Sequence, residues 1–186
     1  MKLIKKIQKF LKAWLGSDTG PTVQDMIDMG MKMGENVLYD VSCNFDYSHC
    51  WLITIGNNVT FGPKTYVLAH DASTKQYLGY TKIGRVTIDD GTFIGACSII
   101  MPGVHIGKNC VIGAYSVVTS DVPDGSVYVG NPAKFVCSTD EYIEKQKKQM
   151  ERLPVFGEEF TLGCGITDEM KRQMLDEMKD GKAFVF

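Results

Sequence analysis

Between Ile88 and Pro123 the hydrophobic positions of the chain recur every six residues. Divided into sixes, this stretch reads IDDGTF, IGACSI, IMPGVH, IGKNCV, IGAYSV, VTSDVP. Each block opens on an aliphatic residue, and its fifth residue is small or β-branched. A period of six fits neither an amphipathic helix nor an alternating strand. It is typical of a parallel β-helix, in which each block forms one short strand and one turn and three blocks close one triangular coil.

Glycine follows the aliphatic residue in three of these blocks, at Gly95, Gly107 and Gly113. Glycine adopts positive φ without steric cost, which suits a sharp corner. We therefore expect the corners of the coil at the second position of each block and the aliphatic first position in its core.

The same period extends towards the N-terminus, with one interruption. Residues 55–60, 61–66 and 67–72 read IGNNVT, FGPKTY and VLAHDA, the pattern fails from Ser73 to Lys82, and it resumes at Ile83. A repeat protein accommodates such an insertion as a loop, and loops gathered on one face often form the binding face. The sequence therefore predicts an all-β core over residues 37–136, with a loop at 73–82.

Helical patterns flank the repeats. Residues 3–15 place apolar side chains at helical spacing, and residues 22–33 form a second candidate helix with Thr22 as its N-cap. Residues 140–152 and 168–179 give two further candidates, which we expect to lie across the β-helix end or a neighbouring subunit. The predicted organisation is a helical segment at 1–36, a β-helix at 37–136 and a helical extension at 137–186.

The polar face of residues 3–15 carries five lysines. A basic amphipathic helix can make peripheral contact with an anionic membrane surface. It can also dock its apolar face on protein, as most amphipathic helices do, and we favour that alternative.

Composition narrows the class of protein. The 186 residues carry a net charge of −2, which argues against a nucleic-acid partner. No apolar run approaches the roughly 20 residues that span a bilayer, and the periodic N-terminus does not resemble a secretory signal. The six cysteines form no CxxC pair, so we expect a reduced, cytoplasmic setting.

The hexads from Ile55 onward, above all residues 86–136, resemble the hexapeptide-repeat acyltransferases. The most similar branch contains the galactoside, maltose, xenobiotic and capsule or lipopolysaccharide O-acetyltransferases. The resemblance covers roughly residues 37–136. It implies a left-handed parallel β-helix, a homotrimer with active sites between subunits, and acetyl-CoA as donor. The general rule for parallel crossovers is right-handed. The left hand of the β-helix therefore comes from the family resemblance alone.

Of the three histidines, His70 stands apart, because it ends the regular coils at the root of the 73–82 loop. Acetyl transfer to a hydroxyl needs a base, and neutral imidazole, with a pKa near 6.5, can accept the proton and return it to the departing thiolate. The resemblance places the family's catalytic histidine on His70. His105 ends a regular hexad, so we interpret it as an ordinary turn residue.

Residues near His49 are candidates for the acceptor pocket, and packing in the first irregular coil is the alternative. The candidates are Asp46, His49, Trp51 and Asp71. Asp71 adjoins His70 in an extended segment, where neighbouring side chains point apart. It therefore suits loop structure or acceptor binding better than orientation of His70, whose orienting group stays open.

The resemblance also implies a donor site, in which the pantetheine arm runs along a groove between two subunits. Small or polar residues match the family's donor contacts at Ala96, Ala114, Thr119 and Ser120. Lys134 matches a basic residue that meets the nucleotide phosphates. The second basic position of the family is Cys137 here. No Ser-His-Asp or Cys-His arrangement supports a covalent acyl-enzyme, so we favour direct attack on acetyl-CoA.

Three alternatives compete with a sugar or glycan O-acetyltransferase that uses His70 as general base. The first is N-acetylation of an amino sugar, which needs less help from a base. The second is a γ-carbonic-anhydrase-like β-helix that holds zinc with three histidines. Since we interpret His105 as a turn residue, we expect no metal. The third is a non-catalytic β-helix scaffold.

Overall fold

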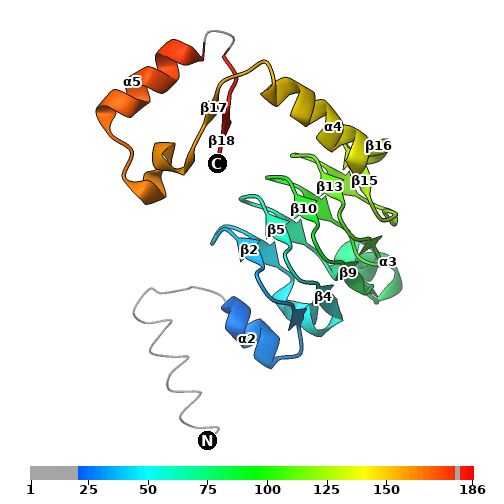
Figure 1. Ribbon diagram of the computed structural model, residues 1–186. Helices are drawn as coiled ribbons and strands as arrows, with labels where there is room; N and C mark the ends of the chain where they lie inside the picture. Colours follow the sequence, from blue (N-terminus) through cyan, green and yellow to red (C-terminus); the bar gives the residue numbers. More distant parts are fainter. Residues whose placement is uncertain (1–20, 179–180) are drawn as a thin grey trace, which may run out of the picture. The chain divides into compact units, whose positions relative to one another are not determined.

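The computed structural model of the chain describes residues 21–178 and 181–186 (Figure 1). The chain divides into two compact units, Met1–Val136 and Cys137–Phe186. The predicted helix at residues 3–15, with its docking and membrane alternatives, lies outside the described residues. Within the described part, no helix combines the length and apolar character needed to cross a bilayer.

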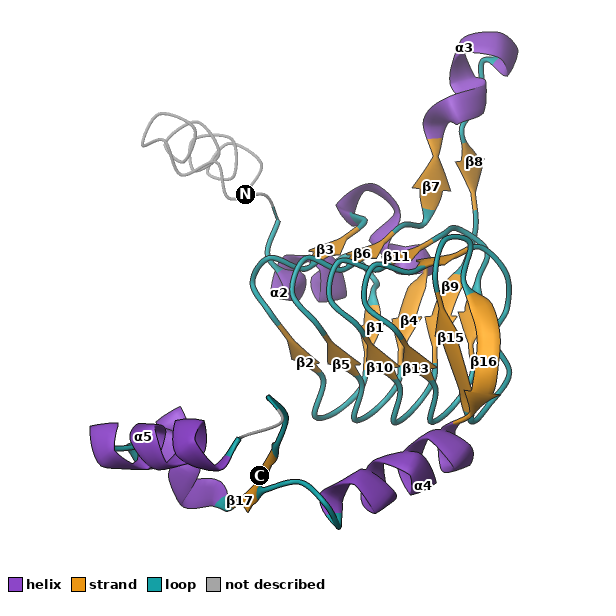
Figure 2. Cartoon of the chain, turned by 90° about the horizontal axis from the view of Figure 1, so that it is seen from above, coloured by secondary structure: helices purple, strands orange, loops and turns teal. Residues whose placement is uncertain are grey.

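The first unit is a parallel β-helix built from three sheets, whose coils stack in Figure 2. The first sheet contains β1 (Lys32–Met33), β4 (Ile53–Ile55), β9 (Val86–Ile88) and β12 (His105–Ile106). The second contains β2 (Leu38–Tyr39), β5 (Thr60–Phe61), β10 (Phe93–Ile94), β13 (Val111–Ile112), β15 (Ser126–Val129) and β16 (Lys134–Ser138). The third contains β3 (Asn44–Phe45), β6 (Tyr66–Val67), β11 (Ile99–Ile100) and β14 (Val117–Val118).

Strand register confirms that three hexads make one coil. Phe93 pairs with Val111, and Ile99 pairs with Val117, each 18 residues later. Every such strand uses the sixth position of one block and the first of the next, so the aliphatic first position points inward. The first-position residues Ile88, Ile94, Ile100, Ile106, Ile112 and Val118 are all buried. The small fifth positions are buried as well, which leaves a narrow continuous core.

The prediction that the corners lie at the second position is wrong. Positive φ occurs instead at the fourth position, at Gly91, Cys97, Gly103, Asn109 and Tyr115. Non-glycine residues tolerate this conformation at some cost, so the fourth position varies and gives no sequence signal. The second-position glycine has another cause, which is close stacking. A Cβ added to Gly95 would lie 2.4 Å from the backbone nitrogen of Ala114 on the next coil.

The β-helix begins earlier than the predicted start at Val37, because β1 already pairs with β4, with Met33 opposite Ile55. The preceding helix is correspondingly short, with α2 at Val23–Asp28. Its N-cap is Thr22, as predicted, since the Thr22 hydroxyl accepts a hydrogen bond from the backbone N–H of Asp25 at 3.2 Å. Met33 continues the helical spacing of α2, which explains why the sequence pattern extends the helix into a strand.

The described residues of the second unit form two helices and a short pair of parallel strands. The helices are α4 (Thr139–Met150) and α5 (Asp168–Glu177), capped by the hydroxyls of Ser138 and Thr167. The strands are β17 (Val155–Phe156) and β18 (Phe184–Val185), and two 3₁₀ segments, η3 (Glu158–Phe160) and η4 (Leu162–Cys164), precede α5.

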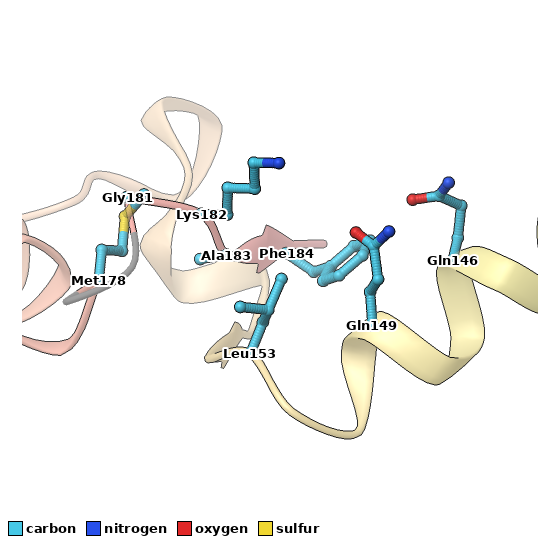
Figure 3. A pocket seen from close by; sticks show the side chains of 8 residues that line it. All are labelled: Gln146, Gln149, Leu153, Met178, Gly181, Lys182, Ala183 and Phe184. Carbon is cyan, nitrogen blue, oxygen red and sulfur yellow. The ribbon is translucent and has the colours of Figure 1, made fainter.

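The second unit also forms a pocket of about 470 Å³ between α4 and the last residues of the chain (Figure 3). Its lining is mixed, with two glutamine amides and the amine of Lys182 around Leu153 and Phe184. It contains none of the predicted site residues.

Candidate active site

Two insertions lengthen the coil beyond its 18-residue spacing, and both lie at one corner. Leu38 pairs with Thr60, 22 residues later, because the 3₁₀ segment η1 (Tyr47–Leu52) is inserted after β3. Thr60 pairs with Phe93, 33 residues later, because a longer excursion leaves the coil after β6. Since β3 and β6 are neighbours in the third sheet, the two insertions begin side by side.

The longer excursion stands on two antiparallel strands, β7 (His70–Asp71) and β8 (Lys82–Ile83). Beyond them lie η2 (Ala72–Thr74) and α3 (Lys75–Leu78), which project from the coil in Figure 2. The predicted loop at 73–82 therefore exists as an ordered excursion. His70 is at its root, with 36% of its side chain exposed.

The Nδ1 atom of His70 contacts the carboxylate of Asp46, which follows β3 on the neighbouring coil. Asp46 is only 5% exposed. Its Oδ1 accepts hydrogen bonds from the backbone N–H of Ser48 at 3.1 Å and from the Ser48 hydroxyl at 2.7 Å. Its Oδ2 accepts from the backbone N–H of Ala69 at 3.0 Å and from His70. These four bonds fill the acceptor sites of a carboxylate.

The same contacts set the charge of Asp46. Burial raises the pKa of its carboxyl, but the hydrogen bonds from Ser48, His70 and Ala69 outweigh burial and leave the pKa below its usual value. Asp46 is therefore a carboxylate at neutral pH and can only accept hydrogen bonds. It follows that the Nδ1 of neutral His70 carries the proton and that the Nε2 carries the lone pair.

His49 and Trp51, which η1 supplies, lie beside this pair. The Ser48 hydroxyl is 2.9 Å from Nδ1 of His49 and 3.2 Å from Nδ1 of His70. The two imidazole rings lie 5.3 Å apart, and the ring of Trp51, a residue that is 55% exposed, lies 5.4 Å from that of His49. Two of the predicted acceptor residues, Asp46 and His49, thus lie beside His70, and a third, Trp51, lies beside His49.

Asp71 has a different environment. Its Oδ2 lies 2.6 Å from Nζ of Lys82, and its Oδ1 accepts from the backbone N–H of Ser73 at 2.8 Å. The hydrogen bond from Lys82 holds the pKa of Asp71 far below its ordinary value. Asp71 thus joins the two strands at the root of the excursion.

One group of potential metal ligands exists among the described residues. Asp46, His49 and His70 each offer a donor atom, and these atoms lie within 4.8 Å of one another. However, the Asp46 oxygens already accept four hydrogen bonds, so a metal ion would have to displace His70 or Ser48. The donor set therefore does not fit an ion while this network is intact.

His105 does not join this group, and its interpretation as a turn residue is wrong. It lies on β12, because strands use the sixth position of each hexad. Its Nε2 lies 2.8 Å from Oδ2 of Asp89 on the outer face of the first sheet.

The predicted donor residues lie along the third sheet and beyond it. Ala96 and Ala114 occupy the corner before this sheet on successive coils, where the backbone N–H of Tyr115 donates to the carbonyl of Ala96 at 2.9 Å. Thr119 and Ser120 follow β14, at the end of the sheet where η1 and the excursion leave, and both are exposed. Lys134 begins β16 in the second sheet and is exposed. A single chain therefore does not gather these residues into one pocket.

Comparison with known proteins identifies the family. The family model described as bacterial transferase hexapeptide (six repeats) matches residues 85–120. YvoF of Bacillus subtilis (strain 168), provisionally named an acetyltransferase, is 36% identical over 121 residues, which cover 65% of this chain and 68% of YvoF. The chain belongs to the hexapeptide-repeat acetyltransferases. A galactoside O-acetyltransferase of Lactococcus lactis is 44% identical over 85 residues, 43% of this chain and 40% of that protein.

A solved structure of this acetyltransferase family supports the fold. The galactoside acetyltransferase in complex with coenzyme A superposes with a TM-score of 0.51 at 24% identity, covering 68% of this chain and 76% of that chain. The prediction of a left-handed parallel β-helix is confirmed. The prediction of an acetyltransferase is confirmed by the family model and by YvoF.

Two features of the site have no clear signal in the sequence. No pattern marks Ser48, and the sequence suggests Asp46 as an acceptor residue rather than as the partner of His70. The register of β3 and β6, with Phe45 opposite Val67, brings Asp46 to the coil position next to the start of the excursion. That register becomes readable only once η1 is recognised as an insertion of four residues, because it lengthens the pairings that span it, β1 with β4, β2 with β5 and β3 with β6, from 18 to 22 residues.

Proposed function

We propose that the chain transfers an acetyl group from acetyl-CoA to a hydroxyl of a sugar or glycan precursor, with His70 as general base. The observation that carries this proposal is the pair formed by His70 and the buried, ionised Asp46. Asp46 fixes the tautomer in which Nε2 of His70 can accept a proton. The side chain of His70 is part-exposed, so a substrate can reach the ring.

The reaction follows from this arrangement. Nε2 of His70 removes the proton of the acceptor hydroxyl as its oxygen attacks the thioester carbonyl and forms the new C–O bond. Collapse of the tetrahedral intermediate breaks the C–S bond, and the proton on Nε2 passes to the leaving sulfur. The products are an acetyl ester and CoA with a free thiol. The charge of Asp46 stabilises the imidazolium that exists between these two steps.

The donor residues are assigned by the family resemblance. Ala96 and Ala114 leave room for the pantetheine arm at the corner before the third sheet, with Thr119 and Ser120 at its far end. The Lys134 amine supplies a positive charge for the nucleotide phosphates. Because one chain does not enclose this path, we place the donor between two subunits of a homotrimer.

Two observations favour a sugar as acceptor. One relative is named a galactoside O-acetyltransferase. In addition, Trp51 is an exposed aromatic side chain beside His49. An indole combines an apolar ring with a polar N–H, which suits a ligand with one apolar face and one polar face.

The test is the His70→Ala variant, with His105→Ala as its matched control. Both substitutions remove a part-exposed imidazole that is paired with a carboxylate. We expect His70→Ala to lose acetyl transfer from acetyl-CoA to a panel of sugars, amino sugars and nucleotide-sugars, while CoA binding by calorimetry is retained. His105→Ala should keep full turnover. Normal turnover by His70→Ala would overturn the assignment, and acetylation of amino groups alone would favour the N-acetyltransferase alternative.

A further inference from the structure

The hydrogen-bond network around Ser48 also determines the protonation of His49. The Ser48 hydroxyl has a single proton. Asp46 is ionised and cannot donate, so at 2.7 Å the Ser48 proton points to its Oδ1. The contact of 2.9 Å between Ser48 Oγ and Nδ1 of His49 then requires that His49 be the donor. Neutral His49 therefore carries its proton on Nδ1 and a lone pair on Nε2.

One buried carboxylate thus holds two imidazoles in the same tautomer. It holds His70 directly and His49 through the Ser48 hydroxyl. The rings lie 5.3 Å apart and are tilted by 39°. Within the described residues no protein group bonds to Nε2 of either ring, so each offers one unused hydrogen-bond acceptor.

Two adjacent acceptors suit a ligand with two adjacent donors. A simple alcohol has one hydroxyl proton, which the reaction uses at His70. A second hydroxyl near the reacting one, as on a sugar ring, would donate to His49. An acceptor lacking that group would leave Nε2 of His49 without a partner as the site closes, which costs about as much as one lost hydrogen bond.

We propose that His49 is a specificity-determining residue, whose Nε2 accepts a hydrogen bond from a second hydroxyl of a diol-bearing acceptor. The proposal rests on the proposed function, because His70 must act on the first hydroxyl. The ring of His49 also packs against the exposed Trp51. The sugar ring would therefore meet an aromatic side chain next to the second hydroxyl.

The test compares three protein forms, wild type, His49→Ala and His49→Gln, on two acceptors. The acceptors are the best sugar of the panel and its monodeoxy analogue, which lacks the hydroxyl next to the acetylated one. For wild type we expect kcat/KM to fall about tenfold on removal of this hydroxyl, the size of one hydrogen bond. For His49→Ala the two acceptors should differ less than twofold, with the loss on the parent sugar appearing in KM. His49→Gln, whose side-chain oxygen can accept a hydrogen bond, should restore part of the discrimination.

Two further measurements separate binding from structure. Nitrogen-15 NMR of the imidazoles should place the proton of neutral His49 on Nδ1 in wild type, and Ser48→Ala should remove that preference. His105→Ala should retain full discrimination between the two sugars. Undiminished discrimination by His49→Ala overturns the proposal, as does a protonated Nε2 of His49. If the proposed function fails instead, His70→Ala keeps its turnover whatever His49→Ala does.

Discussion

Two of the three histidines pair with a carboxylate, but the carboxylates differ in solvent access. The side chain of Asp46 is 3% exposed and that of Asp89 is 31% exposed. An ion pair in solvent contributes about 0–1 kcal/mol and orients its partners weakly. The buried Asp46 is held by four hydrogen bonds and cannot turn away from His70. The burial of its carboxylate partner, rather than the pairing itself, therefore distinguishes the candidate base His70 from His105.

Asp46→Asn is expected to lower kcat about 100-fold or more, within the range by which a general base contributes. The amide preserves the shape, but its NH₂ can donate to His70 and favour the tautomer with the proton on Nε2. Initial rates with acetyl-CoA and the best acceptor would measure this effect. Asp89→Asn is the control, and an equal effect of the two substitutions would show that burial of Asp46 is irrelevant.

The lowered pKa of Asp46 predicts how stability depends on pH. A carboxyl whose pKa is lower in the folded than in the unfolded chain stabilises the fold above its unfolded pKa of about 4. That contribution is lost as pH falls below about 4 and through the folded pKa. We therefore expect the free energy of unfolding of the wild type to decrease more between pH 7 and pH 3 than that of Asp46→Asn. Urea unfolding of both proteins at the two pH values would check this, and parallel decreases would contradict it.

At the scale of elements, regular repetition makes the coil predictable, whereas the irregular insertion η1 conceals which residue of the candidate site pairs with His70. The sequence of the hexads reveals where their strands and core positions lie, because the same residue types recur at the same positions. No such recurrence marks η1, where the apolar run of residues 51–55 merges with the strand that follows. The fourth-position corners were missed because Cys97, Asn109 and Tyr115 share no side-chain chemistry. Their shared conformation depends on the stacked coils, which single-sequence patterns do not contain.

Stacking of the coils predicts the cost of one substitution. Gly95→Ala places a Cβ 2.4 Å from the backbone nitrogen of Ala114, and backbone cannot move aside as a side-chain end can. We expect a loss of about 1–3 kcal/mol in the free energy of unfolding, the usual cost of overpacking. Gly163→Ala is the control, since its nearest neighbour would be Thr161 Oγ1 at 3.9 Å. Urea unfolding gives both values, and equal stabilities would show that the coils can separate to admit a methyl group.

At the scale of the whole molecule, the predicted homotrimer explains features that one chain leaves incomplete. The proposed donor residues are divided between the third sheet, near Ala96, Ala114, Thr119 and Ser120, and the second sheet, at Lys134. Tyr66, Phe93 and Tyr115 on the coil are exposed. The three sheets give the β-helix three flat outer faces, and faces of this kind can pack around a threefold axis.

Sedimentation equilibrium should give three times the mass of the chain. Dilution to concentrations at which the trimer dissociates should abolish acetyl transfer, because each proposed donor site needs two subunits. A monomer that retains full specific activity would contradict the placement of the donor between subunits.

The antiparallel root of the excursion bears on how such an enzyme can change its preferred acceptor. β7 and β8 return the chain to the coil beside its point of departure, and Asp71 and Lys82 join the two strands. Any other loop that replaces residues 73–81 would join the same two strands, β7 and β8. Doubling the length of a flexible loop costs only about 0.6 kcal/mol. New acceptor contacts can therefore be exchanged as a cassette, while the pairing of coils before and after it, and the proposed base His70 at its root, stay in place.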